Sequence, residues 1–123
     1  MQNSQDRVAV IGKNFSSLLE FSRKLNDLEI FHVTLRETST EIVELLQEGE
    51  KFDTLIFDDF EIQRDRGCLH SIASCGSVNL IILTADVNFQ ERQNILQWAS
   101  SGTMPPLRVL PLSIRFDDLK NVI

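Results

Sequence analysis

The sequence predicts an α/β domain of the (βα)5 class, a three-layer sandwich with a central five-stranded parallel sheet between helices. Short runs of β-branched and aliphatic residues alternate with segments whose apolar residues recur at helical spacing. This alternation is typical of parallel sheets wrapped in helices. The chain has 123 residues, 42% of them hydrophobic, which suits one compact core. We therefore expect residues 1–123 to form a single domain.

Five short segments are predicted to be strands. They are residues 8–11, 30–35, 54–57, 78–83 and 107–112. The 54–57 run is apolar on both faces, as a central parallel strand should be. Pro111 interrupts the last run, so that strand belongs at an edge of the sheet or ends there.

A helical segment follows each strand, and its apolar spacing predicts which side chains face inward. The five predicted inward sets are Phe15, Leu18, Leu19, Ser22 and Leu25; Ile42, Leu45 and Leu46; Leu69, Ile72 and Ala73; Arg92, Ile95, Leu96 and Ala99; and Phe116, Leu119 and Ile123. Residues 38–41 (Thr-Ser-Thr-Glu) have the form of a capping box, and Gly49 is placed to end that helix. Asp86 and Ser113 are the expected caps of the fourth and fifth helices.

Charge and composition narrow the choice of partners and compartment. Eighteen acidic against twelve basic residues give a net charge of −6, and the basic residues form no cluster, so we expect no direct binding of nucleic acid. No signal segment and no run of about 18 apolar residues occurs, which favours a cytoplasmic protein without membrane contact. Cys68 and Cys75 lie seven residues apart on a predicted helix, about 10 Å, too far for a disulfide. We expect free thiols.

In open parallel sheets the functional crevice lies at the carboxyl ends of the strands. The sequence places eight residues at those ends, and they form the predicted pocket: Gly12, Lys13, Asp58, Asp59, Thr84, Ala85, Leu110 and Pro111.

The order of these strand ends resembles the receiver domain of bacterial two-component response regulators, a flavodoxin-like family. That family has an acidic pair after strand 1, a phosphoacceptor Asp after strand 3, Thr or Ser followed by Ala after strand 4, and Lys-Pro after strand 5. The run 53–58 (Asp-Thr-Leu-Ile-Phe-Asp) resembles the third-strand motif, 82–85 (Ile-Leu-Thr-Ala) the fourth, and 110–111 (Leu-Pro) the fifth. The resemblance covers nearly the whole chain. It implies that Asp58 holds the phosphoacceptor position and that the peptide bond before Pro111 is cis.

The departures from the family pattern matter for function. Gly12-Lys13 stands where the family has its acidic pair, Leu110 stands where it has Lys, and Leu107 where it has an aromatic residue. Mg²⁺ is held by carboxylates and waters, and phosphoryl transfer to Asp58 would need that cation. The resemblance therefore implies a degenerate receiver, or pseudo-receiver, that is not an enzyme and takes no metal or cofactor. Lys13 either pairs with Asp58 in place of the cation or is solvated.

We expect such a domain to be a regulatory protein-interaction module, for example the N-terminal module of a longer transcription regulator in two-component or phosphorelay signalling. The family's usual pairing face, formed by the fourth helix, fifth strand and fifth helix, is the expected surface for a homodimer or an output domain. Its expected residues are Trp98, Leu107, Arg108, Arg115 and Lys120.

Two other functions remain open. Asp58 accepts a phosphoryl group in a conventional receiver, with Asp59 supplying part of a metal site. Alternatively, the chain is a small flavodoxin-like enzyme or nucleotide binder, although no Gly-rich phosphate loop follows the first strand, where Gly12 stands alone. A structural role is the third interpretation of the aspartates, in which Asp58 and Asp59 end a strand and cap the next helix.

Overall fold

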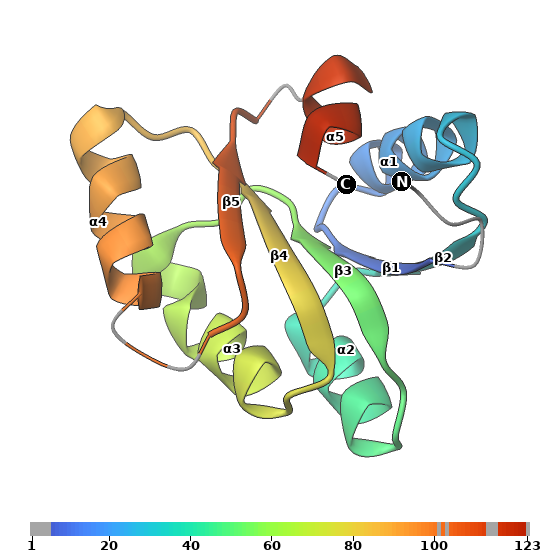
Figure 1. Ribbon diagram of the computed structural model, residues 1–123, viewed down its shortest axis with the longest axis horizontal. Coiled ribbons are helices and arrows are strands. Elements are labelled where there is room, and N and C mark those ends of the chain that lie inside the picture. Colours follow the sequence, from blue (N-terminus) through green and yellow to red (C-terminus); the bar gives the residue numbers. More distant parts are fainter. Residues whose placement is uncertain (1–5, 101, 103, 113–115, 123) are drawn as a thin grey trace.

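The computed structural model describes residues 6–100, 102, 104–112 and 116–122, in which strands and helices alternate (Figure 1). The strands are β1 (Arg7–Ile11), β2 (His32–Arg36), β3 (Phe52–Phe57), β4 (Val78–Thr84) and β5 (Leu107–Leu110). The helices are α1 (Phe15–Asp27), α2 (Ser39–Gln47), α3 (Ile62–Ser74), α4 (Phe89–Ser100) and α5 (Phe116–Val122). All five strands lie in one parallel sheet, so the predicted (βα)5 flavodoxin-like class is confirmed.

The strand order is β2-β1-β3-β4-β5, which places β3 in the middle and β2 and β5 at the edges. Phe57 at the end of β3 is in register with Ile11 on one side and with Leu83 on the other. Thr84 at the end of β4 is in register with Leu110. The carboxyl ends of four neighbouring strands therefore meet at one edge of the sheet, where the sequence predicted the pocket.

Each face of the sheet has its own hydrophobic core. Helices α2, α3 and α4 pack against one face, through buried residues such as Ile42, Leu69 and Ile95. Helices α1 and α5 pack against the other face, through Leu25 and Leu119. Successive strand residues point to opposite faces, so a strand segment covered on both sides must be apolar, as residues 55–57 of β3 are. None of the helices in the described part of the chain has the length and hydropathy needed to cross a membrane.

The helix ends follow the predicted chemistry in two places and depart from it in one. The Thr38 side chain accepts a hydrogen bond from the Glu41 amide at 3.3 Å, and Gly49 after α2 has φ +100°. Helix α4 is capped by Asn88 and not by Asp86. The Asn88 side-chain oxygen Oδ1 accepts a hydrogen bond from the Glu91 amide at 2.8 Å, and Glu91 Oε1 accepts one from the Asn88 amide at 3.1 Å. The cap of α4 therefore lies two residues later than the predicted Asp86, and it takes the form of a capping box.

The second strand begins later than predicted. Ile30 is fully buried, but its amide donates to the Leu25 carbonyl at 2.9 Å and so completes the end of α1. Pairing with β1 starts only at His32. The fifth strand ends at Leu110, directly before Pro111.

Several inward-facing assignments on the helices were wrong. Phe15 and Leu19 are 63% and 46% exposed, while Phe21, which the prediction left out, is buried. Arg92 is exposed, because the buried side of α4 is centred on Ile95 and Ala99. The cysteines are free, as predicted, with Cys68 exposed and Cys75 half-buried. The expectations for Ser113, Ile123 and the Phe116 side chain lie outside the described residues.

Candidate functional site

Thr84 joins the ends of the two central strands at the predicted pocket. Its side chain is fully buried, and its Oγ1 donates a hydrogen bond of 2.7 Å to Asp58 Oδ1. The same oxygen accepts a hydrogen bond of 2.9 Å from the Asp59 amide. These contacts follow from register, since the Phe57↔Leu83 pair places Asp58 beside Thr84. One hydroxyl group therefore fixes both aspartates of the site.

The loop that carries the aspartates is also held through its backbone. The Asp58 amide donates to the Ile11 carbonyl and the Phe60 amide to the Thr84 carbonyl, both at 2.8 Å. Between them Asp59 has φ +54°, in the left-handed region that Asp and Asn tolerate better than most residues. The Asp59 side chain is exposed, whereas that of Asp58 is half-buried. The loop is thus rigidly tied to β1 and β4.

Arg64 and Asp65 complete this support, and the sequence reasoning missed both. Arg64 Nη2 donates to the Asp59 carbonyl at 2.7 Å, and its Nε and Nη2 bind the Asp65 carboxylate at 2.9–3.1 Å. Asp65 is 6% exposed and accepts a further hydrogen bond of 2.9 Å from the Glu61 amide. A carboxylate in the first turn of a helix, next to an arginine, was the available signal. Asp58 and Asp59 do not cap α3. The amide of Glu61, directly before that helix, donates its hydrogen bond to the Asp65 carboxylate.

Burial raises the pKa of the Asp58 carboxyl, and the neighbouring charge of Asp59 adds to that effect, while the hydrogen bond from Thr84 acts in the opposite direction. The carboxyl also lines a cavity of about 280 Å³ beside the first turns of α1 and Leu112. The α1 amides at Ser16 and Ser17 are already bound by the Asn14 side chain. The two α1 amides that border this cavity are therefore not available to an anion.

Lys13 does not act as a counter-ion for Asp58. It is exposed, and no ion pair joins the two side chains, both of which the structure describes. A nearby ammonium group would lower the pKa of Asp58, and the shift is upward. Of the two interpretations of Lys13, the structure supports the solvated one.

Gly12 is buried where the turn after β1 passes close to the site. A Cβ atom at this position would lie 3.1 Å from Leu18 Cδ2 and 3.5 Å from Asp58 Cβ. The turn therefore approaches Asp58 with backbone and not with a side chain. Among the residues that the structure describes, no three His, Cys, Asp or Glu side chains gather closely enough to hold a metal ion.

The strand-5 side of the pocket is apolar and differs from the prediction in one respect. The Leu110 carbonyl accepts a hydrogen bond of 3.0 Å from the Ala85 amide, so these two predicted residues are neighbours. Leu110 is half-buried and Pro111 is exposed. The peptide bond between them is trans, and the cis bond implied by the resemblance was wrong. In the family that bond follows a lysine, which this strand lacks.

The predicted interface residues are spread over different environments. Arg108 and Lys120 are exposed, but Leu107 is only 8% exposed and was wrongly placed on the surface. Alternation along β5 directs Leu107 and Val109 into the core on the α4 side of the sheet. Trp98 is half-buried and lies four residues after Asn94, on the side of α4 that faces α3. Arg115 lies outside the described residues.

The comparisons with known proteins add no family to this description. Neither the protein-family models nor the curated proteins compared with the chain match it.

Proposed function

We propose that this chain is a degenerate receiver module that regulates through protein contacts and without Mg-dependent phosphoryl transfer. The environment of Asp58 is the observation that carries the proposal. Its carboxylate is engaged by Thr84, burial raises its pKa, and Lys13 makes no ion pair with it. A phosphoryl acceptor needs an ionised carboxylate and a cation that neutralises the transferring group. Burial makes ionisation of Asp58 less favourable than that of an exposed carboxyl, and Lys13 does not supply the cation.

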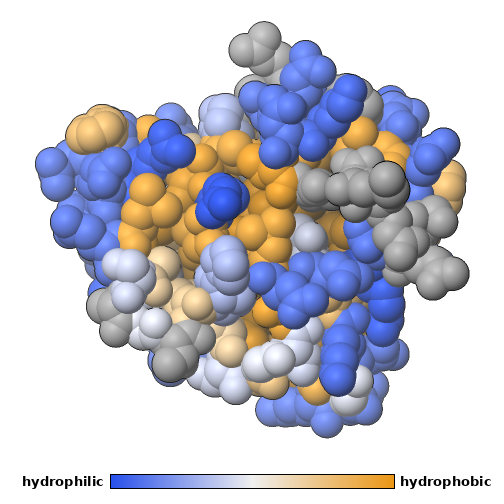
Figure 2. All heavy atoms as spheres, in the orientation of Figure 1, coloured by the Kyte–Doolittle hydropathy of each residue, from blue (hydrophilic) through white to orange (hydrophobic). Residues whose placement is uncertain are grey.

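The face formed by α4, β5 and α5 supports a role in association. Strand β5 is at an edge of the sheet, and Figure 2 shows hydrophobic side chains gathered over it and towards α4, with hydrophilic ones around them. Leu96 and Leu110 are half-buried there, beside the exposed Arg108 and Lys120. An apolar centre with a charged rim is the usual composition of a protein interface. We propose that this face pairs with a second copy or with an output domain of a cytoplasmic transcription regulator.

Sedimentation velocity tests the proposal by comparing the self-association of three variants with that of the wild type. Arg108→Glu changes the charge in the proposed face and should weaken self-association, by about tenfold if the residue lies within the interface. Lys51→Glu makes the same charge change at the other end of the sheet and should have no effect. Asp58→Asn should also leave association unchanged, as should MgCl₂ with a small phosphodonor.

The opposite pattern would favour a conventional receiver. If the phosphodonor changes association of the wild type, and Asp58→Asn abolishes that change, then Asp58 is a phosphoacceptor. Equal effects of Arg108→Glu and Lys51→Glu would show that only net charge matters and would remove the proposed face.

A further inference from the structure

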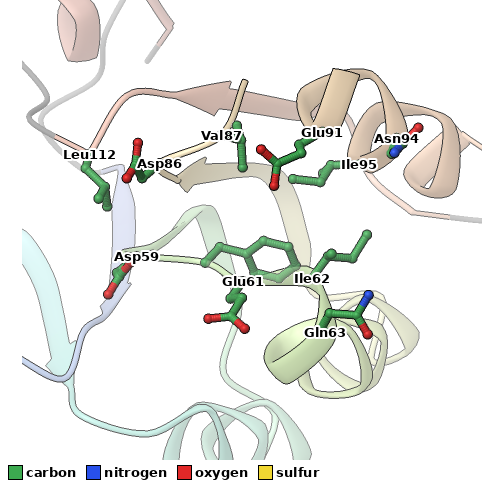
Figure 3. Close-up of a pocket in the computed structure, with 11 residues that line it drawn as sticks. Asp59, Glu61, Ile62, Gln63, Asp86, Val87, Glu91, Asn94, Ile95 and Leu112 are labelled. Carbon is green, nitrogen blue, oxygen red and sulfur yellow. The ribbon is translucent and has the colours of Figure 1, made fainter. Parts of the chain in front are cut away.

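A second surface feature lies between the N-terminal ends of α3 and α4, on the side of the sheet away from α1. It is a cleft of about 580 Å³, and Figure 3 shows its lining. Its floor is apolar and comes from Phe60, Ile62, Val87, Ile95 and Leu112. Phe60 and Ile95 are almost completely buried, whereas Leu112 is 39% exposed. This α3–α4 cleft therefore offers an apolar base within the size range of ligand-binding pockets, about 300–1,000 Å³.

The rim of the α3–α4 cleft is acidic. Asp59, Glu61, Asp86 and Glu91 stand around the floor together with Gln63 and Asn94, and no basic residue is among the described residues that line it. Figure 3 shows carboxylates on both sides of the opening, from the β3–α3 loop below and from the α4 side above. Asp59 and Glu61 come from the β3–α3 loop, Asp86 from the β4–α4 loop and Glu91 from α4, so the charge lies on both sides of the apolar floor.

One arginine offsets part of this acidic rim. The Arg64 guanidinium binds Asp65 and the Asp59 carbonyl and forms an ion pair of 3.6 Å with the Glu61 carboxylate, which leaves Asp86 and Glu91 without an arginine among the described residues that line the cleft. Arg92 lines a neighbouring cavity on the β5 side of α4 instead. Carboxylates that surround an apolar base repel each other, and a cation placed among them relieves that repulsion. The net charge of −6 also attracts cationic partners at a distance.

We propose that the α3–α4 cleft docks a short segment of a partner protein in which arginine flanks an apolar residue. The apolar side chain lies on Ile62, Val87 and Leu112, and the guanidinium group binds the rim. Arginine fits better than lysine because its planar group presents five donors and can bind two carboxylates together. This surface adjoins the proposed α4–β5–α5 face, because Asp86, Val87 and Leu112 also line the cavity on the β5 side of α4. Its α3 side, with Glu61 and Ile62, belongs to the cleft and not to that cavity.

Amide NMR titrations of the whole chain with short peptides of alternating arginine and leucine test the proposal. We expect saturable shifts centred on Ile62, Asn94 and Leu112. The double variant Glu61→Gln, Asp86→Asn should weaken binding about threefold to tenfold. Glu44→Gln, Glu48→Gln is the matched control, because it removes two exposed carboxylates from α2 and should leave binding within about twofold.

Two results would overturn the proposal. One is an equal loss of affinity in the cleft variant and the α2 variant, which would mean that the peptide responds only to net charge. The other is equal binding of a peptide with glycine in place of leucine, which would mean that the apolar floor is not used. Self-association of the single variant Glu61→Gln should match the wild type, because Glu61 lines the cleft and not the cavity on the β5 side, so this test and that of the proposed function fail independently.

Discussion

At the scale of single residues, Thr84 combines two contacts that keep the β3–α3 loop in one conformation. Its hydroxyl group donates a hydrogen bond to the Asp58 carboxylate, and its oxygen accepts a hydrogen bond from the Asp59 amide. Arg64 donates a hydrogen bond to the carbonyl oxygen of Asp59, in the next peptide unit. A residue with φ +54° costs conformational energy, and it persists where its surroundings fix it from several directions. These contacts together favour this one conformation of the loop.

The raised pKa of Asp58 predicts a stability that depends on pH. Burial raises this pKa above the value in the unfolded chain, so between those two values the folded state holds the extra proton. The wild type should then lose stability as pH rises from the unfolded value through the raised folded value. Asp58→Asn keeps the acceptor for Thr84 but cannot ionise. The free energy of unfolding of Asp58→Asn minus that of the wild type should therefore be larger at pH 7 than at low pH.

Urea unfolding between pH 3 and pH 8 measures this effect, with Glu44→Gln on an exposed face of α2 as the control. The free energy of unfolding of the control should change with pH in the same way as that of the wild type. If the difference between Asp58→Asn and the wild type stays constant over this range, burial does not govern the titration of Asp58.

Sequence reasoning found part of this site because of a rule about strand ends. Asp58 follows β3 and Thr84 ends β4, so the rule that functional residues gather at the carboxyl ends of parallel strands placed both at one edge of the sheet. The hydrogen bonds of Arg64 and Asp65 that support the loop could not be predicted from the sequence, because a charged pair at the start of a helix is usually solvated. Here Asp65 is buried, since its carboxylate binds the Glu61 amide. Such burial depends on how the loop turns, which no spacing reveals.

At the scale of elements, two glycines with open surroundings should respond in opposite ways to the same change. A Cβ atom at either Gly49 or Gly67 would meet no atom within 4 Å, but Gly49 has φ +100° whereas Gly67 lies within α3. Gly49→Ala should destabilise the protein by about 1 kcal/mol, because alanine is strained in that conformation. Gly67→Ala should stabilise it by roughly 0.5–1 kcal/mol through helix propensity.

Urea or thermal unfolding of the two variants checks the pair directly. Each variant is the control for the other, since both add one methyl group to an exposed glycine. A loss of stability in Gly67→Ala would mean that α3 needs the glycine for another reason.

Helix α1 shows why element boundaries were easier to predict than buried faces. Its sequence contains two overlapping apolar stripes, one through Phe15 and Leu19 and another through Leu18, Phe21 and Leu25. Both satisfy helical spacing, and periodicity alone cannot choose between them. Packing against β1 and β3 buries the second stripe and leaves the first exposed. The helix itself was predictable, but its rotation required the sheet.

At the scale of the whole molecule, α5 depends on one fully buried side chain among its described residues. Leu119 is 0% exposed and lies in the core between the sheet and α1. Leu119→Ala should cost roughly 2–5 kcal/mol, since it removes buried methyl groups and leaves a cavity. Leu112→Ala is the control at a 39% exposed leucine and should change stability by less than about 1 kcal/mol. Urea unfolding distinguishes them, and similar costs would mean that α5 is not held by Leu119.

The strand order has a consequence for synthesis of the chain. In the order β2-β1-β3-β4-β5, every strand after the first joins an edge that earlier residues have already formed. No strand has to be inserted between two strands that are paired. A nascent chain can therefore extend its sheet outward in the order of translation, and each new strand covers an edge that would otherwise be open to aggregation. Strand β5 is the last to do so, and it protects the outer edge of β4.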